Sequence, residues 1–265
     1  MEEPNDRSSS DASKNIEFTH PDFALRVPLG GNHGGSSRID YSYDRGHSWA
    51  STALPDFETP GIAARTDYIV DGPDSCTLFL TAAKSNGKEG RPLAVRTVDG
   101  GRHWSFLSWI GPEPEGFSIM PASARISESE LLVVLRRRDG WKRWLSAFRS
   151  KNNGQSWNAV DDPVSDLGEG NPPHLIPLAD GRLCLTYAYR AAPFYIAGRL
   201  SSDQGQTWSD EFVIRSDPAN RDLGYVRSIQ RPDGKVVSVY YISEKETGPE
   251  RYIGATIWDP GSSEE

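Results

Sequence analysis

The chain has 265 residues, among them eight Trp, ten Tyr and nine Phe, and its formal net charge is −8. This length suits one large all-β domain, and an acidic chain without a basic run argues against nucleic acid or an anionic membrane as a partner. The sequence has no apolar stretch of about 18 residues, which argues against a membrane-spanning helix. The two cysteines, Cys76 and Cys184, lack metal-type spacing, so buried free thiols are expected and neither a metal nor another cofactor is predicted.

Residues 1–14 are polar and rich in serine. We expect a disordered tail there, followed by a single domain over residues 15–265. The first residues lack the basic and apolar regions of a secretory signal, which predicts a cytoplasmic protein if the chain is complete and a secreted one if a signal peptide has been removed. Residues 16–19 and 23–29 are predicted to form short strands, and the glycine-rich residues 30–35 a flexible connection.

An eight-residue pattern then recurs along the chain. Its copies cover residues 42–49, 97–104, 150–157 and 201–208, with Asn152 in place of an aspartate in the third copy. Each copy ends in Trp, and the tryptophans are 55, 53 and 51 residues apart. Such a period is typical of solenoids, propellers and arrays. A degenerate fifth copy keeps Asp259 and Gly261.

Each copy has the composition of a hairpin turn. A hydroxyl and a carboxylate two residues later can accept hydrogen bonds from N–H groups of the turn. A glycine in each copy is expected to supply a positive φ, at Gly46, Gly101, Gly154 and Gly205. Alternating apolar residues before each copy predict a strand, so the turn joins two antiparallel strands and its Trp fills the seam to the neighbouring hairpin.

Each repeat from residue 61 onward has the same order of elements: a first strand, a polar turn, an apolar second strand and the strand before the hairpin turn. First strands are predicted at residues 64–70, 120–126, 171–178 and 224–229, and second strands at 77–80, 131–135, 183–187 and 236–241. No helix is predicted. The fifth repeat ends before its fourth strand.

The recurring pattern is that of the Asp-box, and the chain resembles the sialidase-like β-propellers, which carry this box between the third and fourth strands of a blade. The resemblance implies an all-β fold: a β-propeller of four-stranded antiparallel blades, with five blades, or six if one is missing or irregular. The ring is expected to close, because an open blade exposes a sheet edge. Residues 16–19 are therefore predicted to supply the missing outer strand of the last blade and to leave the first blade short.

In a propeller the first strand of each blade lines the central channel, and the residues placed there are rich in Arg and Tyr. Arg clusters suit bidentate capture of a carboxylate. Substrate-binding residues are therefore predicted at Arg137, Asn171, Arg190, Arg227 and Tyr241. In the competing interpretation, residues 136–138 form a solvated strand end and the tyrosines pack between blades.

The resemblance adds two expectations about these sites. Arg26 begins an Arg-Val-Pro step similar to the Arg-Ile-Pro step whose Arg holds the carboxylate of sialic acid in sialidases. Tyr225 precedes an Asp-Gly turn by a distance similar to that of the nucleophilic tyrosine of the family. The resemblance therefore implies that Arg26 binds substrate and that Tyr225 is the nucleophile.

The chain departs from the family where the other catalytic groups would lie. The glutamate that deprotonates the tyrosine would fall near Asn171, and Glu169 is the closest substitute, with Asp67 of another blade as a second candidate. The acid/base aspartate would fall within residues 30–37, where His33 is the only titratable group.

These features predict a sialidase-like, exo-acting glycoside hydrolase that acts on an acidic sugar, such as sialic acid, at the end of a glycan. Two alternatives remain open: a non-catalytic glycan-binding or scaffold propeller, and a lyase of uronic-acid glycans that abstracts a proton beside a carboxylate neutralised by Arg. The expected partner is an acidic carbohydrate, with neither nucleic acid nor membrane.

Overall fold

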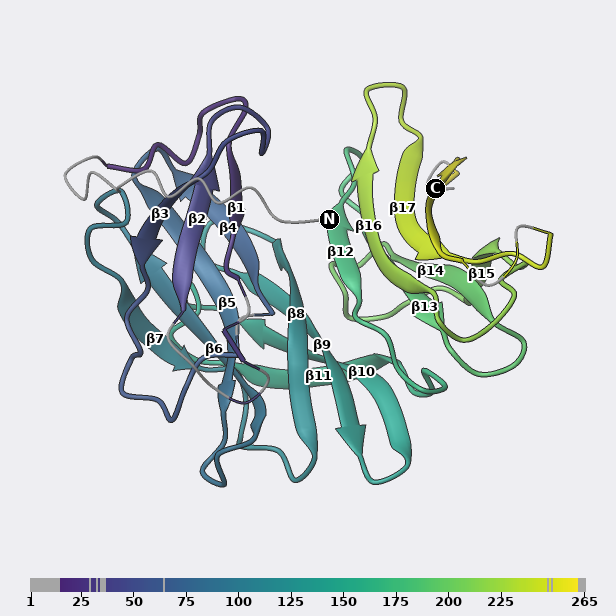
Figure 1. The fold of residues 1–265 in the computed structure, drawn as a ribbon, viewed down its shortest axis with the longest axis horizontal. Coiled ribbons are helices and arrows are strands. Elements are labelled where there is room, and N and C mark those ends of the chain that lie inside the picture. The colour runs from purple at the N-terminus through teal and green to yellow at the C-terminus, as the bar shows by residue number, and fades with distance from the viewer. Residues whose placement is uncertain are drawn as a thin grey trace.

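The structure, a computed structural model, describes residues 15–28, 30–31, 33, 37–63, 65–246, 248 and 250–261. The segment 1–14, predicted to be disordered, lies outside the described residues. The described residues form strands and no helix, and so none that is long and apolar enough to span a membrane. The strands form five antiparallel sheets arranged as the blades of a β-propeller (Figure 1). The predicted all-β, five-bladed fold is confirmed.

Three blades have four strands, and the first and last blades have three. The first blade consists of β1 (Ala24–Arg26), β2 (Arg38–Ser42) and β3 (Ala50–Ala53). The second consists of β4 (Asp67–Gly72), β5 (Ser75–Ala83), β6 (Glu89–Thr97) and β7 (Ser105–Trp109). The third consists of β8 (Phe117–Arg125), β9 (Leu131–Asp139), β10 (Lys142–Ser150) and β11 (Asn158–Val164). The fourth consists of β12 (His174–Pro177), β13 (Leu183–Tyr189), β14 (Tyr195–Ser201) and β15 (Phe212–Arg215). The last consists of β16 (Gly224–Gln230), β17 (Val236–Ile242) and β18 (Tyr252–Trp258).

The first strands of four blades lie side by side around the axis, because β8 packs on β4 and β12, and β12 packs on β16. These strands overlap the predicted first strands, and β5, β9, β13 and β17 overlap the predicted second strands. The strand order within each sheet follows the chain order. The ends of the first strands are therefore the elements that position a site at the axis.

The hairpin turns have the predicted hydrogen bonds. Ser42 Oγ accepts from the N–H of Gly46 at 2.8 Å, and Asp44 Oδ1 accepts from the N–H of Ser48 at 2.9 Å. In the fourth copy Ser201 Oγ accepts from the N–H of Gly205 at 2.7 Å. The glycines have φ between +80° and +86°, which favours a residue without a Cβ.

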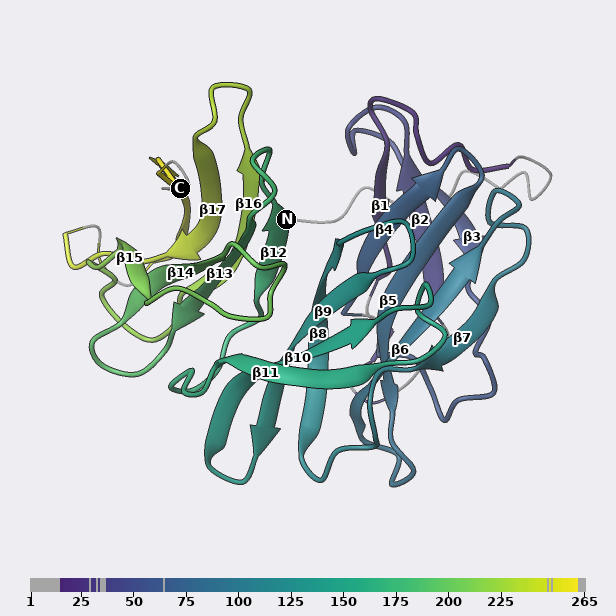
Figure 2. The ribbon, with the colours of Figure 1, turned by 180° about the vertical axis from the view of Figure 1, so that it is seen from behind.

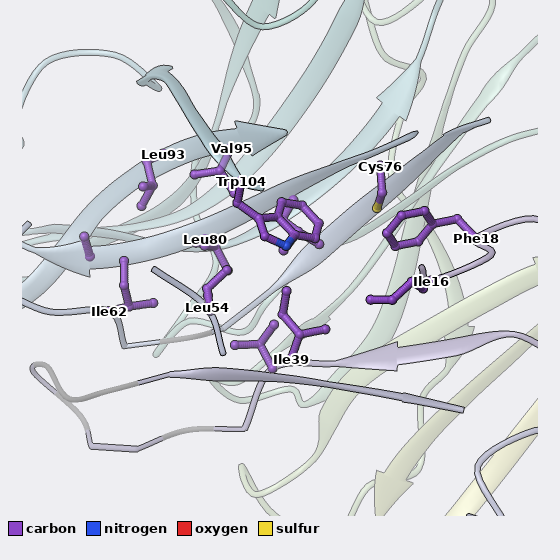
Figure 3. Packing of buried hydrophobic residues seen from close by; sticks show 13 residues of the cluster. Ile16, Phe18, Ile39, Leu54, Ile62, Cys76, Leu80, Leu93, Val95 and Trp104 are labelled. Atoms are coloured by element: carbon purple, nitrogen blue, oxygen red, sulfur yellow. The ribbon is translucent and has the colours of Figure 1, made fainter. Parts of the chain in front are cut away.

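Three of the four tryptophans of the hairpin turns fill the seams between blades, as predicted. Trp104 of the second blade is buried in a cluster that includes Ile39 of the first blade (Figure 3). Trp157 of the third blade packs edge to face on Phe79 of the second, with ring centroids 6.2 Å apart. Trp208 packs on the core between the third and fourth blades. Each of these three tryptophans therefore joins its blade to the preceding one.

The prediction that residues 16–19 complete the last blade is wrong. The N–H of Ile16 donates to the carbonyl of Gly100, and the N–H of Phe18 to that of Pro73, both at 2.8 Å. Ile16 and Phe18 are buried in the same cluster as Trp104, between the first two blades (Figure 3). The alternating apolar side chains of this segment are thus buried without pairing to a strand.

The first and last blades lie at the two ends of the arc of blades, with a gap between their ribbons (Figures 1 and 2). Successive blades pack on each other through their strands, as β13 packs on β16. In the described residues, strands of the first and last blades do not pack on each other to this extent. The expected closure is therefore not made by strand packing there. β18 is the outer edge strand of the three-stranded last blade, and Ile253 and Ile257 on it are 72% and 54% exposed. On the first blade, Trp49 is covered by the guanidinium of Arg26, 4.3 Å from its ring.

Candidate functional site

A cavity of about 210 Å³ lies where the first strands begin, and all five blades contribute to its wall. The lining consists of Val27, Arg65, Thr66, Met120, Pro121, Pro172, Pro173, Tyr225 and Arg227. Two of the predicted site residues, Tyr225 and Arg227, therefore reach one cavity. Tyr225 remains 46% exposed, so its side chain is open to a ligand.

Three side chains of the lining project from an unusual backbone conformation. Arg65, Met120 and Tyr225 have φ of +54°, +56° and +52°, a region that residues other than glycine rarely adopt. Met120 and Tyr225 also lie where the ladder of their strand shifts register. Such bulges redirect side chains next to functional sites, and this one turns Tyr225 toward the cavity.

Asn171 holds the backbone of Tyr225 in this conformation. Its Oδ1 accepts from the N–H of Tyr225 at 3.1 Å, and its Nδ2 donates to the carbonyl of Leu223 at 3.1 Å. The side chain is fully buried, and a Cβ on Gly224 would lie only 2.4 Å from its Nδ2. The structure thus places Asn171 behind Tyr225, as a support of its backbone.

Arg190 and Tyr241 join this group from the neighbouring strands. The guanidinium of Arg190 lies 5.7 Å from the ring of Tyr225 and 5.9 Å from that of Tyr241. Its Nε donates to the carbonyl of Leu223 at 2.8 Å, and its Nη2 donates to the hydroxyl of Tyr241. Burial and a hydrogen bond to Asp222 raise the pKa of Tyr241 to about 12. Tyr241 is therefore a neutral hydrogen-bonding group at neutral pH.

Arg136 is a member of the cluster that the sequence-based prediction missed. Burial lowers its pKa, while the interaction with Tyr225 raises it and the charges of Arg190 and Arg65 lower it further. Its Nε is buried without a hydrogen-bond partner. The signal that would have found it is strand alternation, because adjacent residues of a strand point to opposite faces.

The arginines at the cavity fall into two kinds. Arg65 forms an ion pair with Glu89 at 2.7 Å. Among the described residues, Arg136, Arg190 and Arg227 have no carboxylate oxygen within 4.0 Å of their guanidinium nitrogens. None of these three guanidinium groups forms a salt bridge within the described part of the chain, although Asp67 acts electrostatically on Arg227, Glu89 on Arg136 and Asp222 on Arg190.

The two predicted catalytic carboxylates, Asp67 and Glu169, lie in different surroundings. Asp67 begins the innermost strand of the second blade, and its Oδ2 accepts from the N–H of Ser123 at 2.6 Å and from its hydroxyl at 2.7 Å. Desolvation raises the pKa of Asp67, against the lowering effect of Ser123 and Arg227. Glu169 lies on the exposed surface, where it pairs with Arg221 at 2.5 Å, outside the cavity lining.

Arg26 and Arg137 lie apart from the cavity lining. Arg26 pairs with the buried Asp40 at 3.1 Å in addition to its contact with Trp49. Arg137 stacks on Trp144, with 5.0 Å between guanidinium and ring centre. The two guanidinium groups are thus engaged within their own blades.

Two histidines lie near the innermost strands. His174 Nδ1 accepts from the N–H of Ser228 at 3.0 Å, which links the fourth blade to the fifth. Burial and the charge of Arg227 lower the pKa of His174 to about 3, so this histidine is neutral. His33 Nδ1 accepts from the N–H of Glu89 at 3.3 Å, beside the Arg65–Glu89 pair. No group of three or more metal-ligating side chains occurs in the described part of the chain.

Asp-boxes on the rim of successive blades, together with a cavity at the axis, define a sialidase-like β-propeller. Residues 42–238 match the family model of the BNR repeat-like domain, and the chain belongs to this family. No curated protein matches the sequence.

Solved structures share this fold at low sequence identity. A protein of unknown function from Dyadobacter fermentans is 21% identical with a TM-score of 0.70, over 88% of this chain and 66% of that one. A sialidase from Streptococcus pneumoniae is 13% identical with a TM-score of 0.61, over 85% of this chain and 36% of that one. An α-L-arabinanase from Penicillium chrysogenum is 14% identical with a TM-score of 0.62, over 90% and 84%. The chain thus spans less than two thirds of the first two proteins, and the sialidase and the arabinanase are both glycoside hydrolases.

Proposed function

We propose that the protein is a sialidase-like, exo-acting glycosidase that binds an acidic sugar at the end of a glycan, with sialic acid as the leading example. The observation that carries the proposal is the set of Arg136, Arg190 and Arg227 around Tyr225, without a carboxylate partner in the described residues. A guanidinium binds a carboxylate through two parallel hydrogen bonds. Although the whole chain carries a net charge of −8, three guanidinium groups at one cavity, without a salt bridge among the described residues, would favour an acidic ligand locally.

The size of the cavity supports an exo-acting site. Its volume of about 210 Å³ is below the range of about 300–1,000 Å³ that is usual for drug-sized ligands. One sugar ring fits this space better than an oligosaccharide does. The terminal sugar would therefore occupy the cavity, and the rest of the glycan would lie outside it.

Tyr225 is the proposed nucleophile. Its hydroxyl oxygen would bond to the anomeric carbon while the bond from this carbon to the leaving oxygen breaks. The leaving oxygen would take a proton from Asp67, and Asp67 would take the hydroxyl proton of Tyr225. Water would then displace Tyr225 from the anomeric carbon, and the proton that the water loses would return to the tyrosine oxygen. A tyrosine needs a base or positive charge nearby to attack, and Arg136 and Arg190 supply the charge. Asp67 is the proposed proton carrier, because it directly follows Thr66 of the cavity lining and interacts with Arg227 of the same lining, and because burial raises its pKa.

A specific observation favours the second candidate, a glycan-binding propeller without turnover. In the described residues no carboxylate is hydrogen-bonded to the hydroxyl of Tyr225, and the neutral Asn171 occupies the position next to its backbone. Glu169, the predicted substitute base, pairs with Arg221 instead. Such a protein would bind the same acidic sugar through the same arginines.

The test combines binding and turnover. Calorimetry with free sialic acid, glucuronic acid and a neutral hexose measures selectivity for the carboxylate, and aryl glycosides of the same sugars report hydrolysis. Replacing Arg190 and Arg227 with Ala should abolish acidic-sugar binding, because loss of one partner of a buried charge pair costs about 2–5 kcal/mol. Arg231→Ala is the matched control, since Arg231 pairs with Asp233 on an exposed turn of the same blade.

The outcomes separate the candidates. Hydrolysis that disappears in Tyr225→Phe while binding persists supports the glycosidase. Binding without turnover in the wild type supports the glycan-binding propeller. Equal binding of acidic and neutral sugars, or acidic-sugar binding that survives both arginine replacements, contradicts the proposal as a whole.

A further inference from the structure

A second cavity of about 370 Å³ lies on the last blade. Its lining consists of Asp222, Tyr241, Arg251, Tyr252 and Ile253. Tyr241 and Ile253 are cross-strand partners on β17 and β18, and Asp222 lies two residues before β16. The cavity thus opens beside the sheet face that the last blade leaves uncovered.

Two tyrosines connect this cavity with the central one. Tyr225 lines the central cavity and Tyr241 lines the second, and their ring centroids are 5.8 Å apart. Arg190 contacts both rings. A ligand that extends beyond the central cavity across this pair of rings therefore enters the second cavity directly.

The charged groups of the second cavity are paired with each other, unlike those at the axis. Arg251 forms an ion pair with Asp222, and the hydroxyl of Tyr241 donates to Asp222 at 2.8 Å. The hydrogen bond from Tyr241 and the charge of Arg251 lower the pKa of Asp222. The wall thus offers hydrogen-bonding groups of both kinds and no cation left over for an acidic ligand.

The remaining wall is apolar. Ile253 is 72% exposed, and the ring of Tyr241 presents a flat surface beside it. A neutral sugar matches such a wall. Its C–H groups pack on apolar and aromatic surfaces, and its hydroxyls form hydrogen bonds with fixed donors and acceptors.

We infer that the second cavity binds the neutral sugar to which the terminal acidic sugar is linked. This inference rests on the proposed function, because it requires the acidic sugar to occupy the central cavity. It assigns Arg251 and Ile253 to recognition of the second sugar, and it predicts that a glycan spanning both cavities binds more tightly than the acidic sugar alone.

The test compares three probes by calorimetry: free sialic acid, sialyllactose and lactose. It is performed in the Tyr225→Phe background, so that the trisaccharide is not consumed. Sialyllactose is expected to bind about tenfold more tightly than sialic acid, which is the effect of one or two hydrogen bonds to charged groups. Arg251→Ala and Ile253→Asp should each reduce this ratio toward one and leave the affinity for sialic acid unchanged.

Ile257→Asp is the matched control, because Ile257 lies on the same strand and the same face, is 54% exposed and does not line the cavity. It should keep the tenfold ratio. Sialic acid binding with no gain for sialyllactose, or a gain that survives both cavity variants, overturns this inference and leaves the proposed function standing. Failure of sialic acid and sialyllactose alike to bind overturns the proposed function, and the inference with it.

Discussion

Replacement of Asn171 by Ala should destabilise the protein through two backbone groups of the last blade. The N–H of Tyr225 loses its acceptor, and an unpaired buried donor costs about 1–3 kcal/mol. The carbonyl of Leu223 loses one of two donors but keeps Arg190, so its share is about 0.5–1.5 kcal/mol. The expected loss in the free energy of unfolding is therefore about 1.5–4.5 kcal/mol.

Urea denaturation followed by tryptophan fluorescence measures this loss. Asn86→Ala is the matched control, because Asn86 accepts a single hydrogen bond, from the N–H of Lys88, on an exposed turn. Exposed substitutions of this kind usually change stability by less than about 0.5 kcal/mol. Asn171→Asp should give an intermediate loss, since it keeps the acceptor for Tyr225 and loses the donor to Leu223.

A second readout tests whether Asn171 positions Tyr225. Asn171→Ala should weaken acidic-sugar binding under conditions where the variant is still folded, because Tyr225 has φ of +52° and its backbone is held there by Asn171. Stability within about 0.5 kcal/mol of the wild type, together with unchanged sugar affinity, would refute the role of Asn171 as a support of the Tyr225 backbone.

Three further predictions concern stability. The pKa of His174 is lowered to about 3 in the folded state, so the unfolded chain binds the proton first and stability falls between pH 6.5 and pH 3, by at most about 1.4 kcal/mol per pH unit. In His174→Gln the urea midpoint should depend less on pH in this range, whereas the same dependence on pH as in the wild type would contradict the argument. Trp104→Ala should cost about 3–5 kcal/mol by the same assay, and Trp49→Ala well under half of that, because Trp49 joins no preceding blade; equal losses would exclude the seam role. For Asp203, desolvation is outweighed by hydrogen bonds from Thr207 and Ser201, which lower its pKa to about 2, so its contribution is present above pH 4 and lost as the pH falls through about 2. Asp203→Asn should remove this part of the acid dependence of the thermal midpoint, and a retained dependence would assign it to other groups.

The fold could be predicted because the Asp-box is local. Its hydroxyl, carboxylate and glycine lie within eight residues, and their hydrogen bonds close inside the same turn, as between Ser42 and Gly46. Asn152 preserves the turn in the third copy, since its Oδ1 accepts from Ser156 at 2.9 Å. A motif whose hydrogen bonds form within its own residues can be recognised from the sequence without knowledge of the neighbouring blades.

The prediction for residues 16–19 was wrong because alternating apolar residues indicate that side chains are buried, but they do not indicate which blade buries them. Ile16 and Phe18 need an apolar environment, and either the edge of the last blade or the seam between the first two blades supplies one. The segment packs in the seam between the first two blades, which buries Ile16 and Phe18 nearly completely, at 2% exposure each. Only the three-dimensional packing distinguishes these two solutions.

The site was predicted less fully, for reasons that differ from residue to residue. Tyr225 and Arg227 lie on a first strand, so a propeller register places them at the axis. Arg136 was missed in favour of Arg137 because a one-residue shift along a strand reverses the face. The second cavity forms because Asp222, Tyr241 and Arg251, from three separate segments, lie close together. No spacing in the sequence predicts that these three residues are neighbours.

Salt bridges, and not the mere presence of charge, separate the structural arginines of this protein from those proposed to bind a ligand. Arg149 is nearly buried between the third and fourth blades and bonds Glu130 at 3.0 Å and the carbonyl of Gln204, so its charge is used in holding the fold. Arg190 also bonds backbone and Tyr241, yet it has no carboxylate partner among the described residues. Asp222 acts on Arg190 only at longer range, so this guanidinium can still form a salt bridge with a ligand. This is the physical reason for proposing that a carboxylate binds at the axis of the propeller.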